Sequence, residues 1–253
     1  MDMTFHKLKN LINAHLDNFT TKSDHDHAYA IIEKCQNEIL SADPNSYYVK
    51  AYKAEEIGYW QYIPVWIYQR NKRIKIEKCL DIGCAYGTLS LFCKKISNCE
   101  VYCTDYIDNY LSKTIRNNYN FHFEVNNIER DQAPWNFKYD AIIFTEVLEH
   151  LNCHPLPTLK KIRDLLSEDG SLYISTPDAA SSWGRIINYY KSVNEMPYPS
   201  PSNLSSKYID GHIYQYDENE IIDLADKAGF TINKLKYSQG SVGRHINLKL
   251  IKK

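Results

Sequence analysis

The sequence predicts an α/β protein built around a mostly parallel β-sheet, and two observations lead to this prediction. From Lys78 onward, short apolar runs alternate with amphipathic stretches at helical spacing, a pattern typical of repeated βαβ units with right-handed crossovers. The last two apolar runs have no helix between them, so we expect an antiparallel hairpin at the end of the sheet. A chain of 253 residues is long enough for one such domain with an added helical segment.

Seven strands and four helices are expected in this α/β part, with helices on both faces of the sheet. The strands are expected at residues 78–81, 100–104, 121–125, 141–144, 171–175, 231–237 and 246–251. The helices are expected near residues 88–95, 108–117, 156–166 and 218–228.

Residues 1–72 are expected to form a helical extension in front of a domain that spans residues 73–253. Apolar side chains recur at helical spacing as far as Ala42-Asp43-Pro44. A further helix is expected from about Tyr52 to Arg70, with Pro64 as a break or a new start. Together with their tyrosine neighbours, two tryptophans of this helix are interpreted as a lid over the site. They are Trp60 and Trp66.

Composition excludes several classes of protein. The 30 basic residues are balanced by 31 acidic ones, so the basic excess of a nucleic-acid-binding protein is missing. The seven cysteines are odd in number and include no C-x-x-C pair, which argues against a disulfide scaffold or a zinc ribbon and favours a reducing, cytoplasmic compartment. We expect neither a membrane span nor a secretory leader, because no apolar stretch approaches about 18 residues.

The most informative segment is Asp81–Leu89, which reads D-I-G-C-A-Y-G-T-L. The chain contains only nine glycines, and two of them lie here, between an apolar strand and the start of a helix. Small residues at every second position leave room for a ligand, and the helix N-terminus offers free N–H groups. An ordinary tight turn is the alternative. The dinucleotide fingerprint G-x-G-x-x-G fits poorly, because Ala85 and Thr88 occupy glycine positions.

The spacing D-x-G-x-A-x-G resembles the first motif of the class I S-adenosylmethionine-dependent methyltransferases, which usually have glycine where this chain has Ala85. Other segments similar to the family follow in order: an acid at Asp105, the run 124–129, E-V-L-E-H-L at 146–151, the turn and strand 165–177, and G-H-I-Y at 211–214. The resemblance covers residues 78–252. It implies a Rossmann-like seven-stranded sheet with an antiparallel final strand, and S-adenosylmethionine as the cofactor.

The resemblance also implies roles for individual residues. The carboxylate of Asp105 would accept the ribose hydroxyls, although a capping acid at a strand end is the alternative. Asn127 would bind the adenine amino group and Ile128 would stack on the ring, with a register uncertain by one residue. The full set of expected cofactor-binding residues is Asp81, Gly83, Cys84, Ala85, Gly87, Asp105, Tyr106, Asn127, Ile128, Glu146 and Val147.

Methyl transfer is an in-line displacement in which positioning supplies much of the rate, and a hydroxyl acceptor also needs a base. His150 and His212 are the candidate bases, because a histidine can accept a proton near neutral pH. Asp178 is the candidate that orients a histidine or a hydroxyl. For each of them a purely structural role is the alternative. We expect no metal ion, since His25-Asp26-His27 reads as solvated charge and no carboxylate cluster accompanies His150 and His154.

The acceptor is expected to bind the insert at about residues 179–216, which is rich in tyrosine and carries scattered cations. A tyrosine-rich cover over the sheet is the alternative. The expected acceptor-binding residues are Trp183, Arg185, Tyr208 and Tyr214.

The resemblance favours O-methylation of a small polar acceptor. A sugar is the preferred class, nucleotide-activated or otherwise phosphorylated, in bacterial surface-polysaccharide (capsule) biosynthesis. One alternative is a phenolic or quinone-like metabolite, and another is a cofactor-binding regulatory subunit without activity. No nucleic acid is expected as a partner, and a homodimer is left open.

Overall fold

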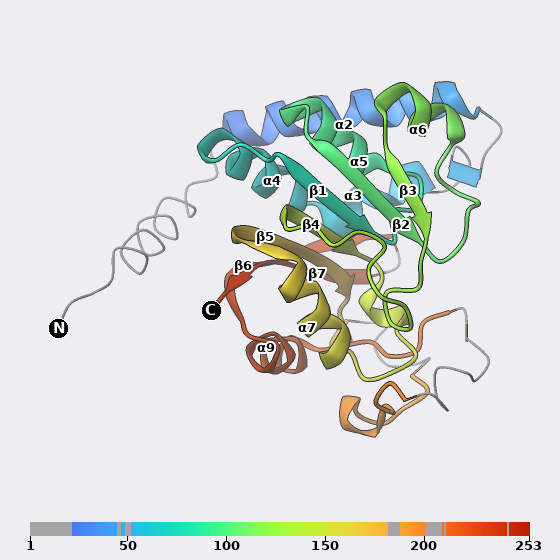
Figure 1. Cartoon of the computed structure of the whole chain (residues 1–253). Coiled ribbons are helices and arrows are strands. Elements are labelled where there is room, and N and C mark those ends of the chain that lie inside the picture. Colours follow the sequence, from blue (N-terminus) through green and yellow to red (C-terminus); the bar gives the residue numbers. More distant parts are fainter. Residues whose placement is uncertain are drawn as a thin grey trace.

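The computed structural model describes residues 22–44, 47–48, 52–181, 188–200, 209, 211–241 and 243–253. Within these residues, seven strands form one sheet (Figure 1). The strands are β1 Lys78–Ile82, β2 Glu100–Asp105, β3 His122–Val125, β4 Tyr139–Thr145, β5 Leu166–Pro177, β6 Phe230–Gly240 and β7 Gly243–Lys252. Their order in the sheet is β3-β2-β1-β4-β5-β7-β6. All seven predicted strands are confirmed.

Strand direction also follows the prediction. Strands β1 to β5 pair in parallel, whereas β7 pairs antiparallel with both β5 and β6. The chain runs outward from β1 to β3 and then returns to the other side of β1 as β4. A crevice at the carboxyl ends of the strands is expected where the direction of winding reverses, and parallel sheets bind ligands there.

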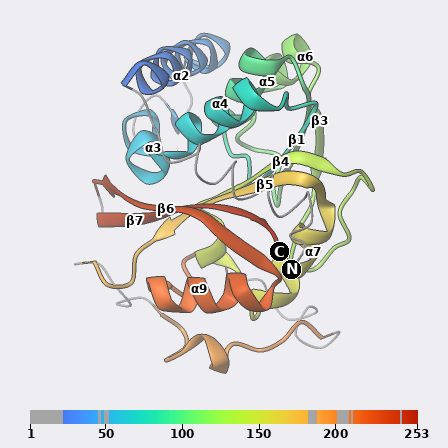
Figure 2. The ribbon, with the colours of Figure 1, turned by 90° about the vertical axis from the view of Figure 1, so that its left-hand side faces the viewer.

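Helices cover both faces of the sheet (Figures 1 and 2). One face is covered by α2, α3, α4, α5 and α6, and the other by α7 and α9. Alternate residues of β1, β2, β4 and β5 enter two separate cores, because successive side chains of a strand point to opposite faces. In β1, Cys79 belongs to the first core, whereas Leu80 and Ile82 belong to the second. The helices are α2 Lys22–Ala42, α3 Lys53–Trp60, α4 Ile63–Arg73, α5 Thr88–Ser97, α6 Lys113–Tyr119, α7 Leu156–Leu165 and α9 Glu218–Lys227.

The helix expected at residues 108–117 begins later, at Lys113. The side chain of Ser112 accepts a hydrogen bond from the backbone N–H of Thr114 at 3.2 Å and caps the helix there. The preceding residues are therefore not helical, and two of them, Tyr106 and Tyr110, line the cavity described below.

Within the described residues, helices α2, α3 and α4 of the N-terminal extension pack onto the sheet as part of the same core. The expected break is confirmed: α3 ends at Trp60, and α4 begins with Pro64 in its first turn, where a missing N–H costs nothing. Asn247 of β7 holds the break, since its Oδ1 accepts from Tyr62 N at 3.2 Å. Trp60 and Trp66 are both buried between helices and sheet.

Two expectations from composition can be compared with the described residues. All seven cysteines are buried and free, as expected. No helix in the described part of the chain is both long and apolar enough to cross a membrane.

Candidate active site

The loop after β1 takes a conformation that depends on its small residues. Gly83, Ala85 and Gly87 all have positive φ, at 72°, 43° and 80°, a region that residues with a Cβ seldom adopt. A Cβ on Gly83 would lie 2.3 Å from Cγ2 of Val147, so no larger residue fits without movement. The N–H of Ala85 donates to Oδ2 of Asp105 at 3.0 Å, which ties the loop to the end of β2.

A cavity of about 310 Å³ lies at the carboxyl ends of β1, β2 and β4. Eight of the eleven expected cofactor-binding residues line it, which brings together four segments that are distant in the sequence. These residues are Gly83, Ala85, Asp105, Tyr106, Asn127, Ile128, Glu146 and Val147. The other three, Asp81, Cys84 and Gly87, line a small recess behind the loop.

Asp81 is a buried anchor of this loop. Its Oδ2 accepts a hydrogen bond from Ser90 Oγ at 2.5 Å, which joins the end of β1 to the first turns of α5. Burial raises the pKa of Asp81 to about 7, and the hydrogen bond from Ser90 opposes that shift. The carboxyl therefore supports the loop and does not line the main cavity.

The loop after β3 contributes Asn126, Asn127 and Ile128 to the cavity wall. Oδ1 of Asn127 is already used, because it accepts from the N–H groups of Glu129 at 3.0 Å and Arg130 at 3.2 Å. Asn126 also lines the cavity, and its Oδ1 is buried without a hydrogen-bond partner among the described residues. Asn126 thus lies one residue from the predicted Asn127 and carries the side-chain acceptor that other described residues leave unused.

Tyrosines form much of the remaining wall, on the cofactor side as well. The ring of Tyr86 lies 5.3 Å from the rings of both Tyr52 and Tyr110, measured between centroids. Tyr52 comes from the N-terminal extension, so that segment contributes directly to the cavity. From the sequence, tyrosines were expected at the acceptor insert of about residues 179–216. The tyrosines that line the cavity are Tyr47, Tyr52, Tyr86, Tyr106 and Tyr110.

A buried carboxyl connects the N-terminal extension to the loop after β1, residues 83–87, which we call the glycine loop. Glu56 of α3 accepts hydrogen bonds from Tyr48 Oη at 2.6 Å, Gln36 Nε2 at 2.7 Å and Thr88 Oγ1 at 2.9 Å. Thr88 is the first residue of α5. Burial raises the pKa of Glu56 to about 7 despite these bonds.

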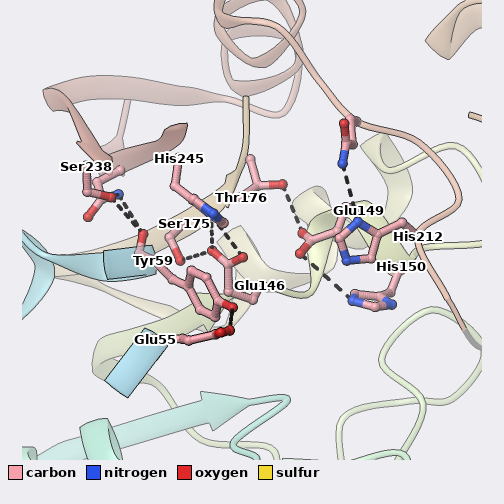
Figure 3. Close-up of polar contacts among 12 residues, drawn as sticks. Glu55, Tyr59, Glu146, Glu149, His150, Ser175, Thr176, His212, Ser238 and His245 are labelled. Carbon is pink, nitrogen blue, oxygen red and sulfur yellow. Dashed lines mark hydrogen bonds and ion pairs between the residues drawn. The ribbon is translucent and has the colours of Figure 1, made fainter. Parts of the chain in front are cut away.

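The two predicted histidines lie together at the edge of the cavity (Figure 3). His150 lines the cavity, and its ring centroid is 4.7 Å from that of His212, edge to face. Glu149 lies beside them with 1% of its surface exposed. Its backbone carbonyl accepts from the N–H groups of Ile213 at 2.7 Å and Tyr214 at 3.2 Å, which brings the segment that carries His212 to the end of β4.

The carboxylate of Glu149 is only partly satisfied. Its Oε2 accepts from Thr176 Oγ1 at 2.9 Å. Its Oε1 lies 3.9 Å from Nε2 of His150, which is too far for a hydrogen bond, and it has no hydrogen-bond partner among the described residues. Burial and the nearby charge of Glu146 raise the pKa of Glu149.

Glu146 is paired with a histidine that sequence reasoning missed. This residue has a positive φ of 55° and lines the cavity. Its carboxylate accepts from Ser175 Oγ at 2.7 Å and lies 3.1 Å from Nδ1 of His245 (Figure 3). Burial lowers the pKa of His245, but the hydrogen bond and charge of Glu146 outweigh it, so that pKa is raised. A lone histidine in a strand gave no signal of this contact.

Two other predicted residues lie away from the cavity. Asp178 is buried, and its carboxylate accepts from Arg244 Nε at 2.6 Å and from the N–H of Ala180 at 2.9 Å. Tyr214 is fully buried, with its hydroxyl donating to Glu220 at 2.6 Å. The polar groups of both side chains are therefore engaged in hydrogen bonds with other parts of the fold. The remaining acceptor predictions, Trp183, Arg185 and Tyr208, lie outside the described residues.

Three solved structures with a similar fold are methyltransferases. An S-adenosylmethionine-dependent methyltransferase from Clostridium acetobutylicum ATCC 824 has a TM-score of 0.58 at 12% identity, over 81% of this chain and 96% of that chain. The 1,6-didemethyltoxoflavin-N1-methyltransferase of Burkholderia thailandensis has a TM-score of 0.57 at 14% identity, over 89% of each chain. Magnesium protoporphyrin IX methyltransferase from Synechocystis PCC 6803 has a TM-score of 0.53 at 15% identity, over 87% of this chain and 94% of that chain. At these identities the likeness concerns the fold.

No curated protein matches the sequence significantly. A family model described as a methyltransferase domain matches residues 50–235, which include the glycine loop and the histidine of the E-V-L-E-H-L segment. This match spans well over half of the chain, and the sheet carries the antiparallel final strand expected from the resemblance. The chain therefore belongs to the methyltransferase domain family.

Proposed function

We propose that this methyltransferase uses S-adenosylmethionine to methylate a hydroxyl group of a small acceptor. One observation carries the proposal. The cavity that begins at the glycine loop and Asp105 extends to His150, and His212 and Glu149 lie beside that histidine. The proposed cofactor site thus adjoins a group of side chains able to act on a hydroxyl.

The residues of the cavity fit this cofactor. Gly83 has no room for a Cβ, Asp105 supplies a carboxylate at the end of β2, and Asn126 supplies a buried acceptor that lacks a partner among the described residues. Asp105 and Glu146 are acidic, which suits a ligand that carries a positive charge. When bound, S-adenosylmethionine supplies a methyl group on a positively charged sulfur, so the protein need not create an electrophile.

The chain's own residues then have two tasks. The walls of the cavity must hold the acceptor oxygen in line with the methyl group, because orientation supplies much of the rate of such a displacement. An aliphatic hydroxyl must also lose its proton as it attacks. His150 and His212 are the side chains to which we assign this second task, and Glu149 assists them. Asp178 is bound to Arg244, so we propose a supporting role for it at the end of β5.

A sugar remains the preferred acceptor, nucleotide-activated or otherwise phosphorylated, as in surface-polysaccharide pathways. The polar group of Glu149, His150 and His212 at the cavity edge supports an acceptor with hydroxyl groups. A phenolic acceptor is the second candidate, and one observation favours it: five tyrosines line the cavity, and aromatic rings stack well on one another.

An acceptor screen tests the proposal. Sugar nucleotides, sugar phosphates and phenols would be incubated with the protein and S-adenosylmethionine, and release of S-adenosylhomocysteine would be measured. We expect turnover with a hydroxyl compound and no turnover with its O-methylated form. A response to phenols alone would exclude the sugar, and a response to amines alone would exclude O-methylation.

A further inference from the structure

We propose that Glu149, His150 and His212 bind a divalent first-row transition-metal ion, on which the acceptor hydroxyl binds as a further ligand. This inference rests on the proposed function and specifies how the hydroxyl is activated. No metal ion was expected from the sequence, in which His212 is far from Glu149 and His150. Backbone hydrogen bonds from Ile213 and Tyr214 to the carbonyl of Glu149 bring it there.

The arrangement of ligand atoms supports a shared ion. One ligand atom from each of the three residues lies within 4.8 Å of the other two. Two ligands that are each about 2.1 Å from one ion are separated by about 3 to 4 Å. Small rotations of the side chains therefore suffice to bring all three onto one ion. Among the described residues, no other group of three histidine, cysteine or acidic side chains meets in this way.

The buried carboxylate is the second, independent observation. Glu149 is almost completely buried, and its Oε1 points toward His150 at 3.9 Å without accepting a hydrogen bond from a described residue. A buried carboxylate oxygen without a partner is costly. A histidine that acts directly as a base would be expected to donate its other ring N–H to an orienting carboxylate, and the separation of 3.9 Å between Glu149 Oε1 and His150 Nε2 is too long for such a hydrogen bond. A cation between these atoms would give this carboxylate oxygen a partner.

The surroundings of His212 fit the same interpretation. Nδ1 of this histidine is 3.4 Å from Nε2 of Gln215, whereas Oε1 of Gln215 is buried without a hydrogen-bond partner among the described residues. The two ends of a glutamine amide are interchangeable in shape. With the amide turned over, Oε1 accepts from Nδ1–H and Nε2 of His212 is left as a ligand. Histidines that bind metals commonly donate their other ring N–H in this way.

The ligand set indicates which ion is bound and what it does. Imidazole favours transition metals and carboxylate favours harder ions, so two histidines with one glutamate suit Mn²⁺, Fe²⁺, Co²⁺ or Zn²⁺. Three protein ligands leave positions open for an acceptor oxygen, as in catalytic metal sites. A hydroxyl bound to the ion loses its proton to water more readily, because the positive charge stabilises the oxygen anion that remains.

Cobalt binding provides the test. The full chain would be treated with a chelator, dialysed and titrated with Co²⁺, whose visible absorption reports coordination by nitrogen and oxygen. We expect one Co²⁺ per chain in the wild type. Replacing a ligand, as in Glu149→Gln or His212→Ala, should weaken Co²⁺ binding at least about 100-fold, and Gln215→Ala should weaken it about 10- to 100-fold. The control His122→Ala, at an exposed histidine of β3, should bind Co²⁺ as the wild type does.

Circular dichroism would verify that each variant is folded. His212 lies in a half-buried loop, so His212→Ala keeps the test valid if Glu149→Gln fails to fold. Absence of Co²⁺ binding by the wild type, or unchanged binding by folded His212→Ala, would overturn the inference. Full turnover after chelation would also overturn it, yet leave the proposed function intact. Binding of Co²⁺ without any binding of S-adenosylmethionine would support the metal site and refute the proposed function.

Discussion

Replacing Gly83 with alanine should destabilise the glycine loop through two separate effects. The backbone φ of 72° costs an alanine about 1 to 2 kcal/mol relative to glycine. The new Cβ would lie 2.3 Å from Cγ2 of Val147, and overpacking of this kind costs about 1 to 3 kcal/mol. Together they predict that Gly83→Ala lowers the free energy of unfolding by about 2 to 5 kcal/mol. The affinity for S-adenosylmethionine should also fall, because Val147 lines the cavity.

A double-mutant cycle separates the two effects. Val147→Ala removes the atom that collides, so combining it with Gly83→Ala should recover about 1 to 3 kcal/mol relative to the sum of the single variants. The backbone cost should remain. Urea unfolding of all four proteins measures the coupling, and calorimetry follows the affinity for S-adenosylmethionine in parallel. Additive free energies would show that the contact between Gly83 and Val147 does not constrain the loop, and the reasoning would then be refuted.

Three further predictions concern other parts of the site. Asp105→Asn should weaken S-adenosylmethionine binding about 10- to 100-fold in calorimetry, since hydrogen bonds to a charged group contribute about 1.5 to 3 kcal/mol; unchanged affinity would remove Asp105 from the ribose site. Glu56 has a raised pKa of about 7 in the fold, so its contribution to stability is present below about pH 4.5 and is lost as pH rises through about 7. Urea unfolding of the wild type and of Glu56→Gln would be measured between about pH 4.5 and 7. Over this interval the unfolding free energy of the wild type should fall by about 3 kcal/mol more than that of the variant. The same dependence on pH in both proteins would contradict this. His212→Ala should lower the rate of methyl transfer at least about 100-fold with S-adenosylmethionine affinity nearly unchanged, whereas a normal rate would exclude His212.

The glycine loop could be predicted from sequence because its signal is local. Strand, turn and helix follow one another within Asp81–Leu89, and a scarce residue marks the positions where φ is positive. The hairpin of β6 and β7 was predictable for a similar reason, since no helix separates the two strands. Parallel pairing then places Asp105 beside the loop, because the carboxyl ends of neighbouring parallel strands meet at one edge.

Contacts made only by the tertiary fold were not predictable. His245 pairs with Glu146 across the sheet, and nothing in the segment around His245 indicates this contact. Tyr52 reaches the cavity because Glu56, one turn further along the chain in α3, accepts a hydrogen bond from Thr88. Thr88 is the first residue of α5, directly after the glycine loop. Tyr214 lies in a segment similar to the family, but the fold buries its side chain. Local patterns identify the loop, whereas burial and long-range pairing determine which side chains reach the cavity.

Calorimetric titration of the full chain with S-adenosylmethionine tests the central claim most directly. If the cavity at the ends of β1, β2 and β4 is a cofactor site, the titration should show one site per chain, and S-adenosylhomocysteine should compete for it. The affinity should fall in both Gly83→Ala and Asp105→Asn. No heat of binding at millimolar S-adenosylmethionine, from protein shown to be folded, would contradict the assignment of this cavity.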